Sequence, residues 1–270
     1  MLVRALSGAV YVALIAGCCL AGEYFFATLM VLLAALGITE LTRLLSAGTD
    51  YRASVGVRVL DILAPALLII AMFLTRFSFG AGCVVFGLLY VTLRMCAAVA
   101  DKRAGQLHGV LTSFAAMAYV AFPLFMLSTA YTLAWRPVAL VLGMFVFIWM
   151  NDTFAYLTGR FLGKHKMCQR LSPKKTIEGF WGGFLFCVGA GALWGYWFDG
   201  VADRLWIWML YAALCSLAGT VGDLFESLIK RSVGVKDSGN IIPGHGGILD
   251  RIDSVLAAAP LALIFAFIIQ

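Results

Sequence analysis

The residues that could do chemistry are concentrated between Gly222 and Asp253, where an otherwise apolar sequence gathers acids, cations, glycines and one histidine. The apolar spacing predicts a helix over 213–231. On one face of that helix lie four polar side chains, Asp223, Glu226, Ser227 and Lys230. The glycines that follow predict a loop, and a second helix is expected to begin near Ile248, with Asp250 and Asp253 on its first turn. The sequence therefore predicts two pairs of carboxylates that face one glycine-rich loop.

Carboxylates in a membrane-spanning helix are costly, at about 2.5–3.5 kcal/mol each near the helix centre, so a cluster of them needs a cation or an aqueous cavity. The acids expected near one membrane face are Asp152, Asp223, Glu226, Asp250 and Asp253. Hard oxygen ligands suit Mg²⁺, which typically binds one or two protein carboxylates together with substrate phosphates. None of the three histidines has the spacing of a zinc motif. The acids therefore predict a magnesium site.

Cations and exposed backbone N–H groups accompany these acids. The cations nearest to them in the sequence are Lys174, Lys175, Lys230, Arg231, Lys236 and Arg251. A metal held by carboxylates and rimmed by cations can bind a polyphosphate and neutralise charge while a phosphoryl or nucleotidyl group moves. The glycines around His245 precede a helix, where N–H groups and the helix dipole favour phosphate, and His245 is expected only to lie near that phosphate.

Several of these features also have simpler interpretations. Lys174 and Lys175 could be markers of the cytoplasmic side of the membrane without any role in binding, and Asp152 could be a buried structural acid. The polar stripe at 223, 226 and 230 could be an intrahelical ion-pair face or the proton relay of a transporter. Three other charged residues, Glu40, Arg43 and Asp61, are expected to pair with one another and to be structural.

The composition is that of a polytopic membrane protein. Hydrophobic residues make up 63% of the chain and charged residues 13%, whereas soluble domains are roughly 45–50% apolar and about 25% charged. Several apolar runs reach the roughly 20 residues that cross a bilayer, which argues against a soluble all-helical protein. The net charge of +6 comes from cations that flank these runs, so no nucleic-acid partner is expected. Six of the seven cysteines lie in apolar runs, and Cys168 stands alone, so no disulfide or zinc framework is predicted.

The apolar runs predict an all-α fold of about nine transmembrane helices with a polar site at the cytoplasmic membrane face. They are expected near residues 6–22, 24–44, 57–75, 78–97, 107–132, 136–158, 178–198, 204–230 and 251–269. All of the 20 lysines and arginines except Arg76, Arg136 and Arg204 fall on one side of this topology. The positive-inside rule then places the N-terminus and the active site in the cytoplasm. We expect residues 1–140 to form N-terminal transmembrane helices and residues 141–270 to form the catalytic region.

Three sequence blocks together resemble the phosphatidate cytidylyltransferase family, also called CDP-diacylglycerol synthases. The blocks run from Asn151 to Tyr156, from Ser172 to Gly179 and, without a gap, from Ser227 to Asp253. The first 140 residues are similar to that family only in being apolar helices. The resemblance implies transfer of CMP from CTP to phosphatidate, giving CDP-diacylglycerol and pyrophosphate, with Mg²⁺ and possible help from K⁺. It also implies a homodimer in the bilayer, and we expect a multi-pass protein of the cell inner membrane.

Roles follow from the resemblance residue by residue. The implied metal ligands are Asp223 and Asp250, with Asp152, Glu226 and Asp253 as further ligands or orienting groups. The implied catalytic set is Asp223, Asp250, Lys230, Lys236 and Arg251. The implied substrate-binding set is Ser172, Lys174, Lys175, Ser227, Arg231, Asp237, His245, Gly246 and Gly247.

Three other functions compete with this one. A CTP-dependent lipid-alcohol kinase would also use acids and cations at the membrane edge, but it would release CDP. A CDP-alcohol phosphotransferase would need more of its acid-rich helix than the fragment from Asp250 to Asp253. An ion-coupled transporter would need polar residues that continue across the membrane, whereas the acids gather at one predicted face.

Overall fold

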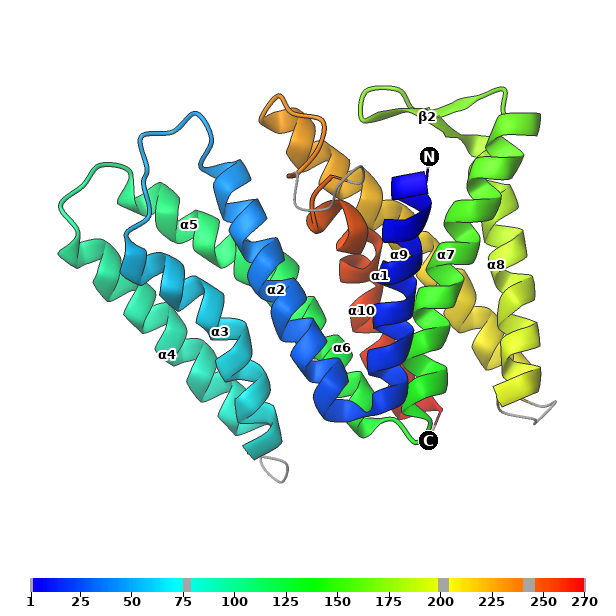
Figure 1. Ribbon diagram of the computed structural model, residues 1–270, viewed down its shortest axis with the longest axis horizontal. Coiled ribbons are helices and arrows are strands. Elements are labelled where there is room, and N and C mark those ends of the chain that lie inside the picture. Colours follow the sequence, from blue (N-terminus) through cyan, green and yellow to red (C-terminus); the bar gives the residue numbers. More distant parts are fainter. Residues whose placement is uncertain (1, 75–78, 199–203, 240–245, 270) are drawn as a thin grey trace. The chain divides into compact units, whose positions relative to one another are not determined.

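The structure is a computed structural model that describes residues 2–74, 79–198, 204–239 and 246–269. Arg76 and His245 lie outside the described residues. Within the described part, each of the nine predicted segments is helical, and eight helices are long and apolar enough to cross a membrane. A bilayer core offers the backbone no hydrogen-bond partners, so apolar segments about 30 Å long must bond internally as helices. The predicted all-α membrane fold is confirmed (Figure 1).

The chain forms two compact units. The first contains residues 1–129 and the segment 237–249, and the second contains residues 130–236 and 250–270. The helical elements that begin in the first unit are α1 (Leu2–Ala21), α2 (Glu23–Leu45), α3 (Val55–Leu74), α4 (Phe79–Ala100), α5 (Gln106–Ala116), the π-helical turn η1 (Met117–Ala121) and α6 (Phe122–Leu133). Gly22 alone joins α1 to α2, and its φ of 113° is one that glycine adopts without strain.

The segment 106–133 was predicted as one helix, and it is a continuous rod with a π turn at its middle. At that turn the N–H of Phe122 donates to the carbonyl of Met117, five residues back. Pro123 follows directly and has no N–H to donate, so the normal α-helical bonding is interrupted here in any case.

The first unit holds a buried polar network around Arg94. This guanidinium donates to the hydroxyls of Ser113 and Tyr51, both at 2.9 Å, and lies 4.0 Å from the carboxylate of Asp61. Asp61 also accepts from Ser113 and from Tyr90, at 2.7 and 2.9 Å. The expectation that Asp61 pairs with Glu40 and Arg43 is wrong, because its partners lie on α4 and α5 rather than on α2.

The second unit is built on close helix packing. Its elements are α7 (Pro137–Leu162), β1 (Lys166–Cys168), β2 (Ser172–Thr176), α8 (Ile177–Phe198), α9 (Leu205–Ser232) and α10 (Leu249–Ile268), of which α10 belongs to it from Asp250 onward. A buried stripe of small residues recurs at every fourth position of α8: Gly179, Gly183, Cys187, Gly191 and Gly195. Small residues at this spacing let helix backbones approach closely, and α8 packs on both α7 and α9.

A methyl group at Gly191 is expected to loosen this packing. A Cβ built there would lie 2.7 Å from the carbonyl oxygen of Trp208 on α9, so the backbones would have to separate. We expect Gly191→Ala to destabilise the protein by roughly 1–3 kcal/mol. A thermal unfolding scan in detergent checks this, with Gly189→Ala as the matched control, because a Cβ at Gly189 on the same helix meets nothing within 4 Å. Equal melting temperatures for the two variants would contradict the packing argument.

Candidate active site

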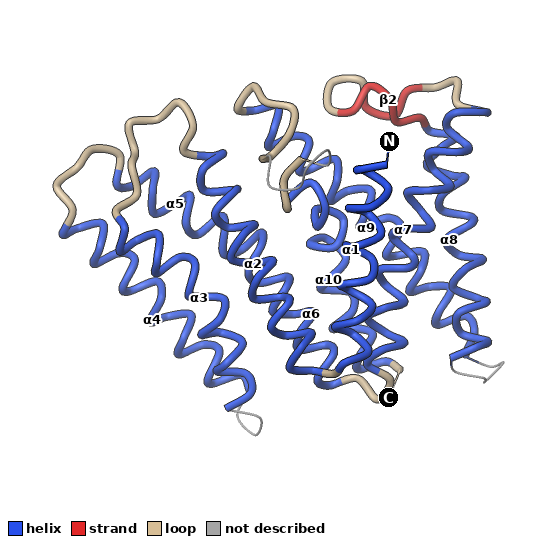
Figure 2. Tube along the Cα trace, viewed as in Figure 1, coloured by secondary structure: helices blue, strands red, loops and turns tan. Residues whose placement is uncertain are grey.

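The polar residues of the second unit gather where α7 ends, α8 and α10 begin and α9 ends. A short antiparallel hairpin of β1 and β2 connects α7 to α8 (Figure 2). It forms the one sheet found among the described residues. The hairpin carries Lys174 and Lys175, while α9 carries the predicted polar stripe and α10 carries Asp250 and Asp253 on its first turn. The helix beginning near Ile248 and the shared face on α9 are both as predicted.

Lys175 forms the first ion pair of the site. Its ammonium nitrogen lies 2.5 Å from Oδ2 of Asp223, and both side chains are about one-third exposed. Because Lys175 is on β2 and Asp223 is on α9, this pair connects the hairpin to the helix that carries the polar stripe. Ser227, one turn further on, donates a long hydrogen bond of 3.5 Å to Asp223.

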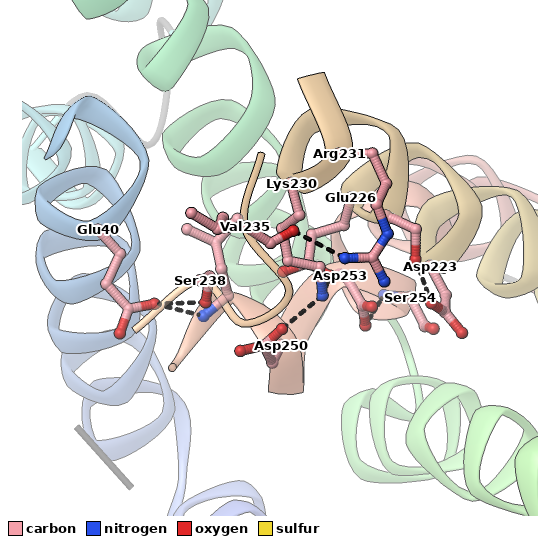
Figure 3. Close-up of polar contacts among 12 residues, drawn as sticks. Glu40, Asp223, Glu226, Lys230, Arg231, Val235, Ser238, Asp250, Asp253 and Ser254 are labelled. Carbon is pink, nitrogen blue, oxygen red and sulfur yellow. Dashed lines mark hydrogen bonds and ion pairs between the residues drawn. The ribbon is translucent and has the colours of Figure 1, made fainter. Parts of the chain in front are cut away.

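Lys230 forms the second and more deeply buried part of the site. Its ammonium nitrogen lies 2.5 Å from Oε2 of Glu226 on the same helix and 2.6 Å from Oδ1 of Asp250 on α10 (Figure 3). All three side chains are at most one-tenth exposed. One cation therefore compensates two buried acids that come from different helices.

Helix α9 meets α10 closely enough to bring the remaining acids near. A Cβ built on Gly222 would lie 2.5 Å from the carbonyl oxygen of Asp253, so glycine is needed at this crossing. Asp253 is buried, accepts the N–H of Ser254 at 2.6 Å and interacts electrostatically with Asp223 and Asp152. The exposed Asp152 on α7 also interacts with Lys175 and Arg251. The structure thus brings all five predicted acids into one electrostatic cluster.

The donor set fits a divalent cation in its chemistry. Carboxylates are the preferred ligands of Mg²⁺, and Oε1 of the buried Glu226 has no hydrogen-bond partner among the described residues. No three acids of the described chain lie close enough to share one ion, and the ammonium groups of Lys175 and Lys230 lie beside Asp223 and Asp250. The acids outnumber the cations Lys175, Lys230 and Arg251 that interact with them. The cluster therefore offers the ligand type that a divalent cation prefers, although no three acids of the described residues are arranged to share one ion.

The other predicted substrate-binding residues lie around this cluster or on the loop that follows α9. On the hairpin Ser172 is half-buried and Lys174 is exposed. At the end of α9 the exposed Arg231 donates to the carbonyl of Val235 at 2.7 Å. The connection between α9 and α10, residues 233–248, contains Lys236, Asp237, Gly246 and Gly247, with Lys236 and Asp237 exposed and Gly247 buried. Of this set, only His245 lies outside the described residues.

Sequence reasoning missed the contacts of Glu40. Its carboxylate, which is only 5% exposed, binds the loop before α10 rather than Arg43 or Asp61. The sequence signal that could have drawn attention to it is an acid within an apolar, membrane-spanning helix.

Comparison with known proteins agrees with the resemblance seen in the sequence. Residues 2–269 match the cytidylyltransferase family. Over 121 residues the chain is 50% identical to the phosphatidate cytidylyltransferase of Staphylococcus aureus, 47% to that of Staphylococcus haemolyticus and 46% to that of Staphylococcus epidermidis. The matched segment covers 45% of this chain and 46% of each relative, so it spans about half the length of these curated relatives. Because the family match runs through almost the whole chain, the protein belongs to the cytidylyltransferase family.

Proposed function

We propose that this multi-pass membrane protein is a phosphatidate cytidylyltransferase, which makes CDP-diacylglycerol and pyrophosphate from CTP and phosphatidate. The observation that supports this most directly is the pairing of two acids, Asp223 on α9 and Asp250 on α10, with Lys175 and Lys230. Such a site can bind a metal and phosphates together. The proposal also rests on the phosphatidate cytidylyltransferases to which the chain is similar.

The chemistry needs positioning and charge neutralisation rather than an activated side chain. Phosphatidate brings its own nucleophile, a phosphate oxygen, which attacks the α-phosphorus of CTP. A new P–O bond forms, the bond between the α-phosphorus and the bridging oxygen breaks, and pyrophosphate leaves with that oxygen. Lysines near the carboxylates would hold the two anionic substrates close despite their repulsion. The residues proposed to contact phosphates are Lys174, Lys175, Lys230, Lys236 and Arg251.

We propose Asp223 and Asp250 as the principal Mg²⁺ ligands and Asp152, Glu226 and Asp253 as further ligands or orienting groups. The bound ion would supply neutralisation of the charge that develops on the triphosphate. A role for K⁺ is part of the same proposal. The excess of acids over cations in the cluster supports it.

The orientation, location and assembly are also proposals. The uneven distribution of lysine and arginine supports a cytoplasmic N-terminus and a cytoplasmic site in the cell inner membrane. A site at helix ends would let CTP arrive from the aqueous side and phosphatidate from the adjacent leaflet. We further propose a homodimer, and a catalytic region within residues 141–270.

Pyrophosphate release by the purified protein in detergent tests the function. We expect release that requires CTP, phosphatidate and Mg²⁺ together, that stops when EDTA removes the metal, and that yields CDP-diacylglycerol as the lipid product. Release of CDP with a phosphorylated lipid alcohol would instead favour a CTP-dependent kinase. Substrate uptake by proteoliposomes without CTP would favour a transporter.

A further inference from the structure

We propose that Glu40, on α2, is a positioning residue that holds the backbone of the loop between α9 and α10, directly before Asp250. This inference rests on the proposed function for its catalytic consequence, but its structural content does not. Glu40 lies about two hundred residues away in sequence from the loop it binds. Its role is to fix the loop, and it is not assigned contact with substrate.

Three hydrogen bonds connect the Glu40 carboxylate to the loop, and Figure 3 shows Glu40 pointing toward the loop at Ser238. Oε1 accepts the N–H of Ile248, and Oε2 accepts the N–H of Leu249, both at 2.9 Å. Oε2 also accepts the hydroxyl of Ser238 at 3.2 Å. The two ends of the described loop, Ser238 on one side and Ile248 with Leu249 on the other, are therefore held by one carboxylate.

The environment makes these hydrogen bonds strong. Glu40, Ile248 and Leu249 are each less than one-tenth exposed, so water competes little for the donors. Among the described residues no cation forms an ion pair with Glu40, so its charge is compensated by backbone N–H groups. Leu249 is the first residue of α10, where N–H groups lack partners within the helix and a negative charge is favoured.

Two loop glycines give the carboxylate its access. A Cβ built on Gly239 would lie 2.6 Å from Oε1 of Glu40, and one built on Gly247 would overlap both Oε2 and the Ser238 hydroxyl. A side chain at either position would therefore displace the Glu40 carboxylate, or the loop, from the contact seen here. The glycine content of the loop thus has a packing reason in addition to any contact with phosphate.

The consequence for the reaction follows from chain continuity. Leu249, whose N–H is held by Glu40, directly precedes Asp250, the acid that pairs with Lys230. Loss of the carboxylate would leave buried N–H groups without acceptors, and the loop would shift or open to satisfy them. Asp250 and Gly247 would then be less well placed for CTP and the metal.

Amide hydrogen exchange in detergent tests the structural part without any assay of activity. We expect Glu40→Ala to speed exchange at Ile248 and Leu249 by roughly tenfold or more, and Glu40→Gln, which keeps one acceptor oxygen, to give a smaller increase. Asp50→Asn, which changes an exposed acid outside the site, is the matched control and should leave both amides as they are. Unchanged exchange in Glu40→Ala would overturn the proposal, as would an equal rise along all helices.

A double-mutant cycle tests the contact itself. Gly239→Ala is expected to reduce turnover by roughly tenfold in the unmodified chain but by little in the Glu40→Ala background, where the shortened side chain makes room for the new methyl group. Additive losses would show that the two residues act independently and would overturn the proposal. If the unmodified protein releases no pyrophosphate, the proposed function fails while the exchange experiment still decides the role of Glu40.

Discussion

Asp250→Asn is expected to lower the rate of pyrophosphate release by roughly 10³-fold, because it removes the negative charge of a proposed Mg²⁺ ligand while it keeps the size of the side chain. The carboxylate is one-tenth exposed and 2.6 Å from Lys230, so the asparagine can still accept a hydrogen bond from that ammonium group. The fold should therefore survive. Steady-state pyrophosphate release with saturating CTP, phosphatidate and Mg²⁺ measures the effect.

The same assay on Asp223→Asn should show a comparable loss, since both acids are proposed as principal metal ligands. Asp50→Asn serves again as the control for an exposed acid. Gel filtration of each variant in detergent verifies that it is folded. Near-normal turnover by either Asp223→Asn or Asp250→Asn, in a folded protein, would refute the metal assignment.

Lys230→Met is expected to destabilise the protein by about 3 kcal/mol, because it leaves Glu226 and Asp250 buried beside each other without their shared cation. For a chain of this size the melting temperature should fall by roughly 10 °C. Differential scanning fluorimetry in detergent measures the shift. The exposed Lys174→Met on the hairpin provides the control, and it should leave the melting temperature unchanged.

A compensating substitution separates loss of charge balance from loss of packing. Glu226→Gln in the Lys230→Met background removes one of the two uncompensated acids and is expected to recover at least half of the lost stability. If the double variant is no more stable than Lys230→Met, the lost stability comes from packing. The interpretation that Lys230 stabilises Glu226 and Asp250 through ion pairs is then wrong.

The helices could be predicted from the sequence because each bilayer crossing is a separate apolar run, and its length is set by the membrane rather than by its neighbours. The expected segments near 204–230 and 251–269 correspond to α9 at Leu205–Ser232 and α10 at Leu249–Ile268. The shared face of Asp223, Glu226 and Lys230 followed from helical periodicity alone. The chemical roles of these residues stay predictions.

Local sequence could not reveal the hairpin or the distant polar contacts. The strand Ser172–Thr176 contains a proline and two lysines, which are poor signals for a strand, and it forms through pairing with Lys166–Cys168. Glu40 was expected to pair with Arg43 and Asp61, whereas its carboxylate accepts from N–H groups 208 and 209 residues away. Such partners depend on tertiary packing and leave no periodic trace in the sequence.

The lysines beside Asp223 and Asp250 can also affect the insertion of the protein into the membrane. A newly made chain must move α9 and α10 into the bilayer, where a bare carboxylate is costly. Lys175 and Lys230 already pair with these two acids, so their insertion should cost less than that of bare carboxylates. If the proposed Mg²⁺ site is correct, removal of the ion should lower turnover and leave the amount of inserted protein unchanged.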